Sequence, residues 1–264
     1  MITADVVKKL RDMTGAGMMD CKRALTEANG DMEKAVDVLR KSGAAKAEKK
    51  SGRATTEGKI ACIIDGNVGA MVEVLCETDF VAKTDKFNAY LADLLKRIAA
   101  GEGNGCVSEA VQAAEKEAMV ALIATIGENM QIRRAARWAA EGKLASYIHM
   151  AGRIGVMVEV EGSADEELLK NVCMHIAAFN PAFIDRSEVP AEWIAREKEI
   201  AAAQLAGKPA DMIEKIVMGK INKRYTEVGL MDQPWIMDDK ASLAKLYKDL
   251  KVKRFARWEI GEEL

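Results

Sequence analysis

The chain has 264 residues, of which 49% are hydrophobic and 30% charged, and its formal net charge at pH 7 is -2. This size permits one large domain or two to three modules with their own cores. The near-zero charge excludes the long-range positive field with which strongly basic proteins attract nucleic acid. The apolar runs are shorter than the roughly 20 residues of a membrane span, and no signal-type apolar block opens the chain, so we expect a cytosolic protein.

The cysteines favour a reducing compartment. Their number is odd, they lie far apart and they form no CxxC pair, as expected for a protein without a disulfide framework. We expect free and mostly buried thiols at Cys21, Cys62, Cys76, Cys106 and Cys173.

Three short helices are predicted in the first part of the chain. Thr3 and Asp31 are candidate N-caps for the first and third helices. Gly15 interrupts the first helical pattern, and Ser42 and Gly43 are predicted to end the third helix. Because a unit of about 40 residues lies near the lower size limit for independent stability, we interpret it as a docking module.

A basic segment extends from residue 41 to residue 53, with the sequence KSGAAKAEKKSGR. It could be a solvated, flexible linker, or it could contact RNA. No aromatic residue is interleaved for base stacking, which favours the linker. Residues 1–53 are therefore predicted to form a three-helix docking domain with a basic linker.

Strand periodicity begins after the basic segment. Lys59–Ile64 and Val68–Leu75 are rich in β-branched residues and flank Asp65-Gly66-Asn67, a pattern typical of a β-hairpin. An amphipathic helix is predicted next, with apolar residues at helical spacing over residues 87–98. A further helix is predicted over residues 108–125, with Ser108 as its candidate cap.

The second half of the chain repeats part of the first. Residues 68–74 (VGAMVEV) align with residues 154–160 (IGVMVEV), and five of the seven positions are identical. An amphipathic helix follows each copy, and residues 98–100 of the first helix align with residues 176–178 of the second. The offset is 86 residues between the strands but 78 between the helices, so the first copy has eight extra residues, around 77–83. Packing alone does not require this extra piece, because the second copy lacks it.

A different composition begins after residue 190. Residues 191–206 and 210–227 are rich in Ala, Lys and Glu and flank Gly207-Lys208-Pro209, which predicts an antiparallel helical hairpin. The hairpin could be a dimerisation device or a passive projection. A helix over residues 242–250 and a strand over residues 252–260, rejoining the second sheet, are predicted to close the chain.

No motif for catalysis or cofactor binding is found. The chain has no GxxxxGK[ST] phosphate loop, no GxSxG elbow and no HExxH zinc motif. The two histidines, His149 and His175, belong to no metal-binding pattern. We therefore expect no cofactor, no metal site and no catalytic residue. An unrecognised hydrolase and an RNA- or ribosome-associated module stay as alternatives.

Five segments of the chain resemble the elongation factor Ts family, in the order of that family and across the whole chain. Residues 14–22 (TGAGMMDCK) and 78–83 (TDFVAK) are long enough to make chance agreement implausible. The other segments are residues 25–31 (LTEANGD), 126–129 (IGEN) and 153–156 (RIGV).

The resemblance implies an α+β fold with three parts. These are a three-helix, UBA-like N-terminal domain, a core of two related α+β subdomains, and an inserted helical hairpin that forms a coiled coil. In this sequence the subdomains would comprise residues 54–140 and residues 141–189 plus 228–264, and the hairpin would comprise residues 190–227. The resemblance also implies a non-enzymatic translation factor that binds elongation factor Tu, a GTPase, and promotes its guanine-nucleotide exchange.

The matching motifs also imply which residues carry the function. In the family the Thr-Asp-Phe-Val segment approaches the magnesium site of the GTPase. This role is implied here for Thr78, Asp79, Phe80 and Val81. The implied partner-binding positions are Arg11, Met18, Met19, Ile126, Gly127 and His149. After His149 this chain has Met150-Ala151, where relatives tend to be rich in glycine.

Several roles stay open at this stage. Phe80 could be an apolar wedge that enters the partner, on a turn capped by Thr78, or it could plug the core of its own domain. Met18 and Met19 could dock on the partner or belong to the helix core. Asp79 could hold the turn or oppose anionic groups in the partner. The complex could contain one or two copies of each protein.

Overall fold

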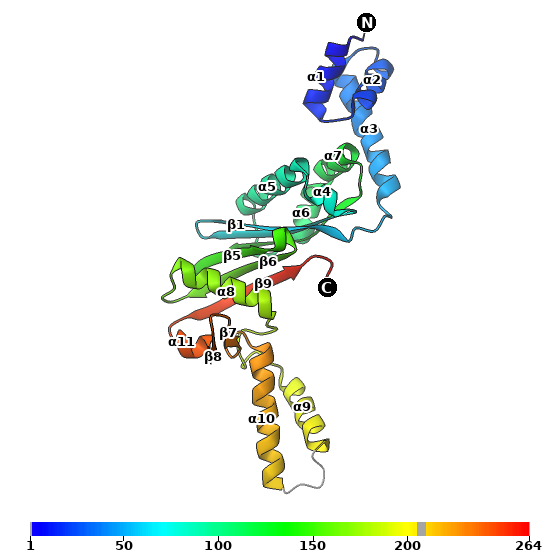
Figure 1. Ribbon diagram of the computed structural model, residues 1–264. Coiled ribbons are helices and arrows are strands. Elements are labelled where there is room, and N and C mark those ends of the chain that lie inside the picture. Colours follow the sequence, from blue (N-terminus) through cyan, green and yellow to red (C-terminus); the bar gives the residue numbers. More distant parts are fainter. Residues whose placement is uncertain (1, 205–209, 264) are drawn as a thin grey trace.

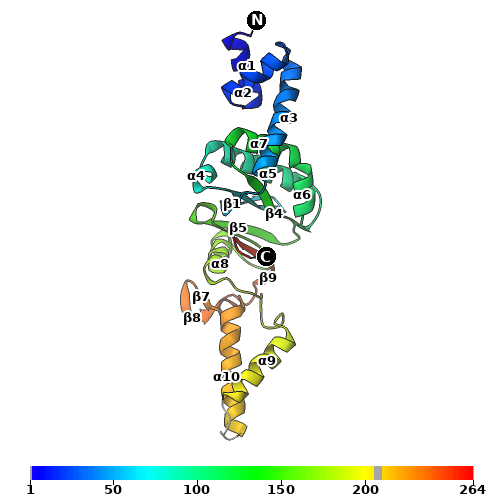
Figure 2. The ribbon, with the colours of Figure 1, turned by 90° about the vertical axis from the view of Figure 1, so that its right-hand side faces the viewer.

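The computed structural model describes residues 2–204 and 210–263. Its elements lie along one elongated molecule, with three helices at the N-terminal end, sheets in the middle and a helix pair at the far end (Figure 1). The view turned by 90° shows the same elongation (Figure 2). Antiparallel sheets and separate helices make this an α+β fold, as expected from the sequence.

The N-terminal helices are α1 (Ala4–Thr14), α2 (Met18–Glu27) and α3 (Met32–Lys50). Both predicted N-caps are confirmed, because the side chain of Thr3 accepts a hydrogen bond from the backbone of α1 and that of Asp31 accepts one from α3. The helices enclose a small apolar core of Val7, Leu10, Cys21, Ala24, Leu25, Ala28 and Ala35.

Helix α3 does not end at Ser42 and Gly43, so that prediction is wrong. Gly43 is buried, and a Cβ atom at this position would lie 3.2 Å from the Cβ of Ala124 in α7 (Lys116–Ile126). The glycine therefore allows close packing between two helices and is not a terminator. As a result, most of the predicted basic linker is ordered helix that packs on the first sheet domain, with Ala47 in its core.

The first sheet has the order β1-β2-β4-β3 and is antiparallel throughout. The predicted hairpin is confirmed as β1 and β2, and the predicted amphipathic helix as α5, which buries Phe87 and Leu94 against the sheet. The strands and helices of this half are β1 (Glu57–Asp65), β2 (Val68–Cys76), α4 (Asp79–Ala82), α5 (Asp85–Ala100), β3 (Gly105–Cys106), α6 (Ser108–Ala114), α7 and β4 (Met130–Ala139).

The helix predicted over residues 108–125 is two helices, α6 and α7, and the break lies at Glu115. The Glu115 carboxylate turns inward and accepts hydrogen bonds from the Arg97 guanidinium at 2.6 and 2.8 Å and from the Tyr90 hydroxyl at 3.2 Å. Ser108 does not cap the helix either, because its hydroxyl accepts a hydrogen bond from the backbone of Ala135 in β4 at 2.9 Å.

The second sheet has the order β5-β6-β9. The predicted closing strand is confirmed as β9, which pairs with β6, but the predicted helix before it is reduced to the single turn α11. The elements of this half are β5 (Lys143–His149), the 3-10 turn η1 (Met150–Gly152), β6 (Ile154–Glu161), α8 (Glu166–Phe179), β7 (Pro234–Trp235), β8 (Asp238–Ser242), α11 (Leu243–Leu246) and β9 (Lys251–Glu259).

Helices α9 (Ala191–Ala203) and α10 (Ala210–Val228) form the helix pair at the far end of the molecule (Figure 1). Val217 and Ile221 of α10 are buried against Ile194 of α9. The turn predicted at residues 207–209 lies outside the described residues.

The internal repeat is visible in the sheets, since β2 and β6 are the matching central strands. The pairing of β2 with β4 has a register shift after Glu73, and the pairing of β6 with β9 has one after Glu159. These two glutamates occupy the same position in the repeat. The extra residues of the first copy form α4 and its flanking turns, between β2 and α5.

The two sheets pack face to face, and the repeat makes their contacts reciprocal. The guanidinium of Arg134 in the first sheet lies 4.6 Å from the ring centre of Trp258 in the second. In the matching contact, Arg254 of the second sheet lies 4.5 Å from the ring centre of Trp138 in the first. Such cation–π contacts are worth about 2 kcal/mol when they are desolvated. The apolar layer between the sheets includes Ile60, Met71, Leu75, Ala136, Trp138, Met157 and Ile260.

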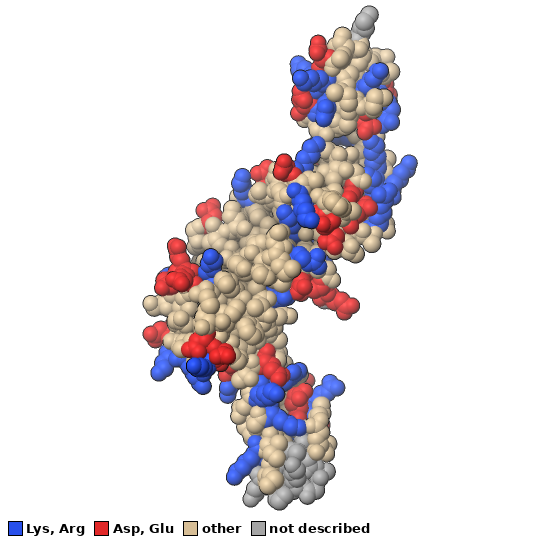
Figure 3. Space-filling view, in the orientation of Figure 1, with Lys and Arg blue, Asp and Glu red and all other residues tan. Residues whose placement is uncertain are grey.

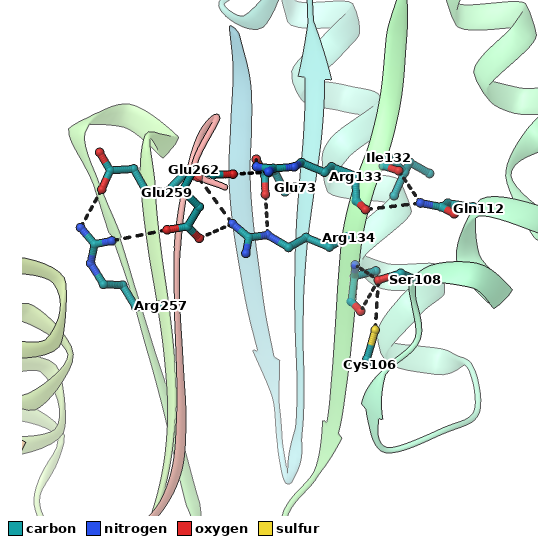
Figure 4. A network of polar contacts seen from close by, with 11 residues as sticks. Glu73, Cys106, Ser108, Gln112, Ile132, Arg133, Arg134, Arg257, Glu259 and Glu262 are labelled. Carbon is teal, nitrogen blue, oxygen red and sulfur yellow. Dashed lines mark hydrogen bonds and ion pairs between the residues drawn. The ribbon is translucent and has the colours of Figure 1, made fainter. Parts of the chain in front are cut away.

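Each arginine also neutralises a buried glutamate. Glu73 is fully buried and accepts hydrogen bonds from Arg133 at 3.1 Å and from Arg134 at 2.5 Å. Glu159 is 5% exposed and is paired with Arg254 at 2.7 Å. Figure 4 shows that the Glu73 network continues across the gap between the sheets, where Arg134 also binds Glu262 at 2.6 Å.

The buried network makes a prediction about stability. Glu73→Gln should lower the free energy of unfolding by about 3 kcal/mol, because it removes the carboxylate of a buried ion pair and leaves the largely buried Arg133 without a carboxylate partner, while Arg134 keeps Glu262. Urea denaturation measures the change. The control is Asp93→Asn, which breaks an exposed pair with Lys96 and should change stability by less than about 1 kcal/mol. Equal effects of the two substitutions would contradict the role assigned to Glu73.

The second core contains a fully buried histidine, His175 of α8. Its Nδ1 accepts a hydrogen bond from the backbone N–H of Ile236 at 3.3 Å, so Nε2 carries the proton and donates to Gln233 at 2.9 Å. The ring stacks between Phe179 and Trp235, with centre distances of 4.7 and 5.2 Å. Burial lowers the pKa of His175, although the hydrogen bond with Gln233 opposes this shift.

The lowered pKa of His175 predicts a loss of stability in mild acid. Below about pH 6.5 the unfolded chain binds a proton at this residue while the folded chain does not, so stability falls as pH decreases from there toward the folded-state pKa. This residue contributes a slope of at most about 1.4 kcal/mol per pH unit. We expect His175→Gln to flatten the dependence of the free energy of unfolding on pH between 7 and 5.

The matched control is His149→Gln, which replaces the other histidine at an exposed position. This substitution should leave the slope near that of the unsubstituted protein. If His175→Gln kept the full slope, burial of this residue would not be its cause.

Candidate functional site

The extra piece of the first repeat forms an exposed turn with an aromatic residue at its outer side. Phe80 of α4 is 78% exposed, which is unusual for a phenylalanine. The hydroxyl of Thr78 accepts a hydrogen bond from the Val81 N–H at 3.3 Å, so the predicted cap is confirmed. Val81 and Ala82 face inward and are buried in the core of the first sheet domain.

The hypothesis that Phe80 fills the core of its own domain is therefore wrong. The phenylalanine in the core of the first sheet domain is Phe87 of α5, which is fully buried. The two sides of the turn therefore lie in different environments. Val81 is buried in the core of the first sheet domain, and Phe80 projects into solvent. Sequence alone could not distinguish these two phenylalanines, because both lie in amphipathic segments.

Asp79 begins α4 and makes a local ion pair. Its carboxylate lies 2.6 Å from the ammonium of Lys83, one helical turn later. The hydrogen bond from Lys83 is the main reason that the pKa of Asp79 is below its ordinary value, and backbone N–H groups of the turn act in the same direction. Asp79 is thus held as a carboxylate at the exposed edge of the turn, beside Phe80.

A second segment, the turn after α7, holds the base of α4. The carboxylate of Glu128 accepts hydrogen bonds from the backbone N–H groups of Glu77 and Thr78 at 3.1 and 3.0 Å, and from the Thr78 hydroxyl at 2.7 Å. In return, the Glu77 carboxylate accepts a hydrogen bond from the N–H of Asn129 at 2.6 Å. Sequence analysis assigned no role to Glu77 or Glu128, although Glu128 belongs to the motif at residues 126–129 and Glu77 directly precedes the motif at residues 78–83.

The turn after α7 also contains two of the predicted partner-binding residues. Ile126 is half-buried and packs on the first core, and Gly127 is the left-handed C-cap of the helix, with φ of 96°. Lys50 at the end of α3 donates a hydrogen bond to the Gly127 carbonyl at 2.6 Å. The structure therefore brings Ile126 and Gly127 close to Thr78 through Glu128.

The predicted residues of the N-terminal domain form a separate exposed group. Met18 and Met19 begin α2 and are 43% and 75% exposed, so neither belongs to the helix core. Arg11 and Met13, near the end of α1, are exposed as well. The loop between α1 and α2 lies against α7, where a Cβ atom at Gly15 would be 3.8 Å from the Thr125 side chain.

His149 lies on the other sheet, at the end of β5, and is exposed. Its Nδ1 is 3.1 Å from the hydroxyl of Tyr147. The next two residues, Met150 and Ala151, have φ of 48° and 55°, a left-handed conformation that glycine adopts more easily. An apolar groove separates this segment from α5, and its lining includes Ile60, Leu91, Leu95, Ile148 and Ala151.

Three of the positively charged side chains in the predicted linker form ion pairs or hydrogen bonds with other parts of the chain. Lys46 pairs with Asp20 at 2.7 Å, Lys50 binds the end of α7, and Arg53 pairs with Glu77 at 3.3 Å. Charges of both signs are interspersed over the face seen in Figure 3. No observation on this segment favours an RNA-binding surface.

The described residues include no cluster of three or more side chains suited to hold a metal ion. No helix among them is both long and apolar enough to cross a membrane. All five cysteines are free, and Cys21, Cys76 and Cys173 are buried, whereas Cys106 is exposed.

Comparison with known proteins identifies the family. The family model described as "Elongation factor TS" matches residues 77–262. The chain is 48% identical to elongation factor Ts of Thioalkalivibrio sulfidiphilus, and the match covers 99% of this chain and 92% of that protein. It is also 47% identical to elongation factor Ts of Clostridium botulinum, where the match covers 99% of this chain and 94% of that protein. The identity to elongation factor Ts of Methylococcus capsulatus is 47% as well, with 99% of this chain and 92% of that protein covered. The chain therefore belongs to the elongation factor Ts family, whose members are translation elongation factors with a role in nucleotide exchange.

Proposed function

We propose that this chain binds elongation factor Tu in its GDP-bound form and opens the magnesium site by inserting Phe80. Thr78 caps the turn that presents the ring, Asp79 adds negative charge beside it, and Val81 anchors it. The observation that carries this proposal is the exposure of Phe80 at 78%, on a capped turn that the second repeat does not need.

Exchange requires a difference in affinity. An exchange protein can shift the GTPase toward nucleotide release only if it binds the nucleotide-free form more tightly than the nucleotide-bound form. Bound nucleotide must then weaken the affinity for the exchange protein by the same ratio. Burial of a phenylalanine side chain contributes about 1.5 to 3 kcal/mol. This is enough to stabilise a displaced arrangement around magnesium, which requires near-octahedral ligands and tolerates small shifts poorly.

The remaining predicted residues would supply affinity. Met18 and Met19, with Arg11, would dock the N-terminal domain, which we interpret as UBA-like. Flexible methionine side chains suit such a surface because they adapt to irregular partners. Gly127 and His149 would extend the contact along the core, together with Ile126.

We further propose the domain boundaries implied by the family. Residues 1–53 would form the docking domain, residues 54–140 the first core subdomain, and residues 141–189 plus 228–264 the second. The pair α9 and α10, within residues 190–227, would act as a coiled coil. Complexes of one or two copies of each protein are both compatible with this arrangement, and light scattering on the complex would distinguish them.

The first test of function is the release of fluorescent GDP from purified elongation factor Tu. The unsubstituted protein should accelerate release, and Phe80→Ala should lower the maximal rate by about tenfold, since loss of about 1.4 kcal/mol corresponds to this factor. The control is Met218→Ala, which removes another exposed side chain, 46% accessible, from α10 at the far end of the molecule.

Two outcomes would contradict the proposal in different ways. If the unsubstituted protein left GDP release unchanged, exchange on this GTPase would be rejected. If Phe80→Ala were as active as the parent, the wedge would be rejected while the family assignment would stand.

A second test separates docking from release. Met19→Glu should raise the concentration of factor needed for half-maximal release by about tenfold or more, because a charge in an apolar contact is desolvated without a partner. The maximal rate should change little, since Phe80 is intact. Met218→Glu is the matched control, and an equal effect of both substitutions would remove Met19 from the docking surface.

A further inference from the structure

We infer that Glu128 is a positioning residue for Phe80, and this inference rests on the proposed exchange function. The Glu128 carboxylate holds three donors of the connection between β2 and α4, at 3.1, 3.0 and 2.7 Å. Two of these donors belong to Thr78, which caps α4. The residue that presents the aromatic ring is thus held by a carboxylate from a segment fifty residues away in sequence.

These hydrogen bonds determine where the turn begins. Bonds to a charged acceptor are shorter and about twice as strong as neutral ones. The Thr78 hydroxyl donates to Glu128 and at the same time accepts from the Val81 N–H, so the cap can form only in one orientation of the side chain. Phe80 follows two residues later, and its direction depends on this orientation.

The hold is reciprocal. While Glu128 binds the backbone of residues 77 and 78, the Glu77 carboxylate binds the backbone of Asn129 at 2.6 Å. The Asn129 amide in turn donates to the carbonyls of Ser51 and Arg53, at 3.3 and 2.8 Å. These hydrogen bonds therefore couple three segments: the base of α4, the turn after α7 and the end of α3.

Packing alone does not fix the exposed side of the turn. Helix α4 has four residues, and an isolated helix of this length is unstable in water. Val81 and Ala82 anchor its inner side in the core, but Phe80 on its outer side has no such support. Without Glu128 the ring would sample a range of directions, and ordering it would cost free energy at the step in which the ring enters the already docked partner.

The test is GDP release from elongation factor Tu with Glu128→Gln, which keeps the size of the side chain. The amide oxygen can still accept from the two backbone N–H groups, which both bind Oε2, but without the negative charge, and the NH2 group takes the place of Oε1, so the Thr78 hydroxyl can no longer donate to residue 128. The maximal release rate should fall about tenfold, since misplacement by about 1 Å can cost a positioned group about a hundredfold in rate. The half-saturating concentration should change by less than about twofold, because docking surfaces are intact.

A double-substitution cycle distinguishes positioning from general stabilisation. In a Phe80→Ala background, Glu128→Gln should lower the rate by less than about twofold, because there is no ring left to position. Thr78→Val should behave like Glu128→Gln, and Thr78→Ser should recover most of the rate that Thr78→Val loses, since it keeps the hydroxyl. Asp93→Asn on α5 is the control for a distant carboxylate.

Each result decides between the alternatives. If the unsubstituted protein accelerates release but Glu128→Gln does so equally well, Glu128 has no positioning role while the exchange function stands. If the losses from Glu128→Gln and Phe80→Ala multiply, Glu128 acts independently of the ring and the inference is overturned. Should Glu128→Gln lose its cooperative thermal unfolding, the pair Thr78→Val and Thr78→Ser decides the question in the same cycle.

Discussion

The arrangement of the core depends on two buried glutamates, one in the central strand of each of the two packed sheets. Burying a carboxylate is strongly unfavourable unless it is paired and hydrogen-bonded. Glu73 and Glu159 each meet this requirement with an arginine of the neighbouring strand, and each arginine then stacks on a tryptophan of the opposite sheet. A shift of one sheet over the other would break both contacts at once. Charge compensation therefore orients each arginine within its own sheet, the arginine–tryptophan contacts set the position of one sheet on the other, and apolar side chains fill the space around them.

This constraint explains why the functional turn can be irregular. The repeat in the second sheet connects its strand to its helix without an insertion, so a connection of this kind can be made without α4. The inserted residues are free to place an apolar ring in solvent, an unfavourable location for the free protein. Only the inner residues of the turn contribute to the core, through Val81 and Ala82. Core packing and the proposed partner binding thus belong to different side chains of the same short segment.

Sequence predicted the elements whose signals are local. Caps such as Thr3 and Asp31, the hairpin of β1 and β2, and the repeat of β2 in β6 depend on neighbouring residues or on direct comparison of two segments. The errors arose where a distant contact overrode the local signal. Gly43 continues a helix because α7 packs against it, and the predicted helix breaks where Glu115 turns toward Arg97. The motifs at the site were found by resemblance, but the contact between two of them was not predicted, because Glu128 reaches Thr78 across fifty residues.

The rigidity of the turn bears on how an exchange factor can work at all. A flexible ring could settle against the nucleotide-bound GTPase as well as against the empty one, and equal affinity for both states shifts nothing. Under the proposed mechanism, a ring held in one direction would fit the partner only in its displaced, nucleotide-free arrangement. The difference between the affinities for the nucleotide-free and the nucleotide-bound partner would then come from the change in the partner's conformation and not from the strength of the Phe80 contact itself. In this chain the hydrogen bonds around Thr78 hold the base of the turn, and Val81 provides the anchor from which the ring of Phe80 can act.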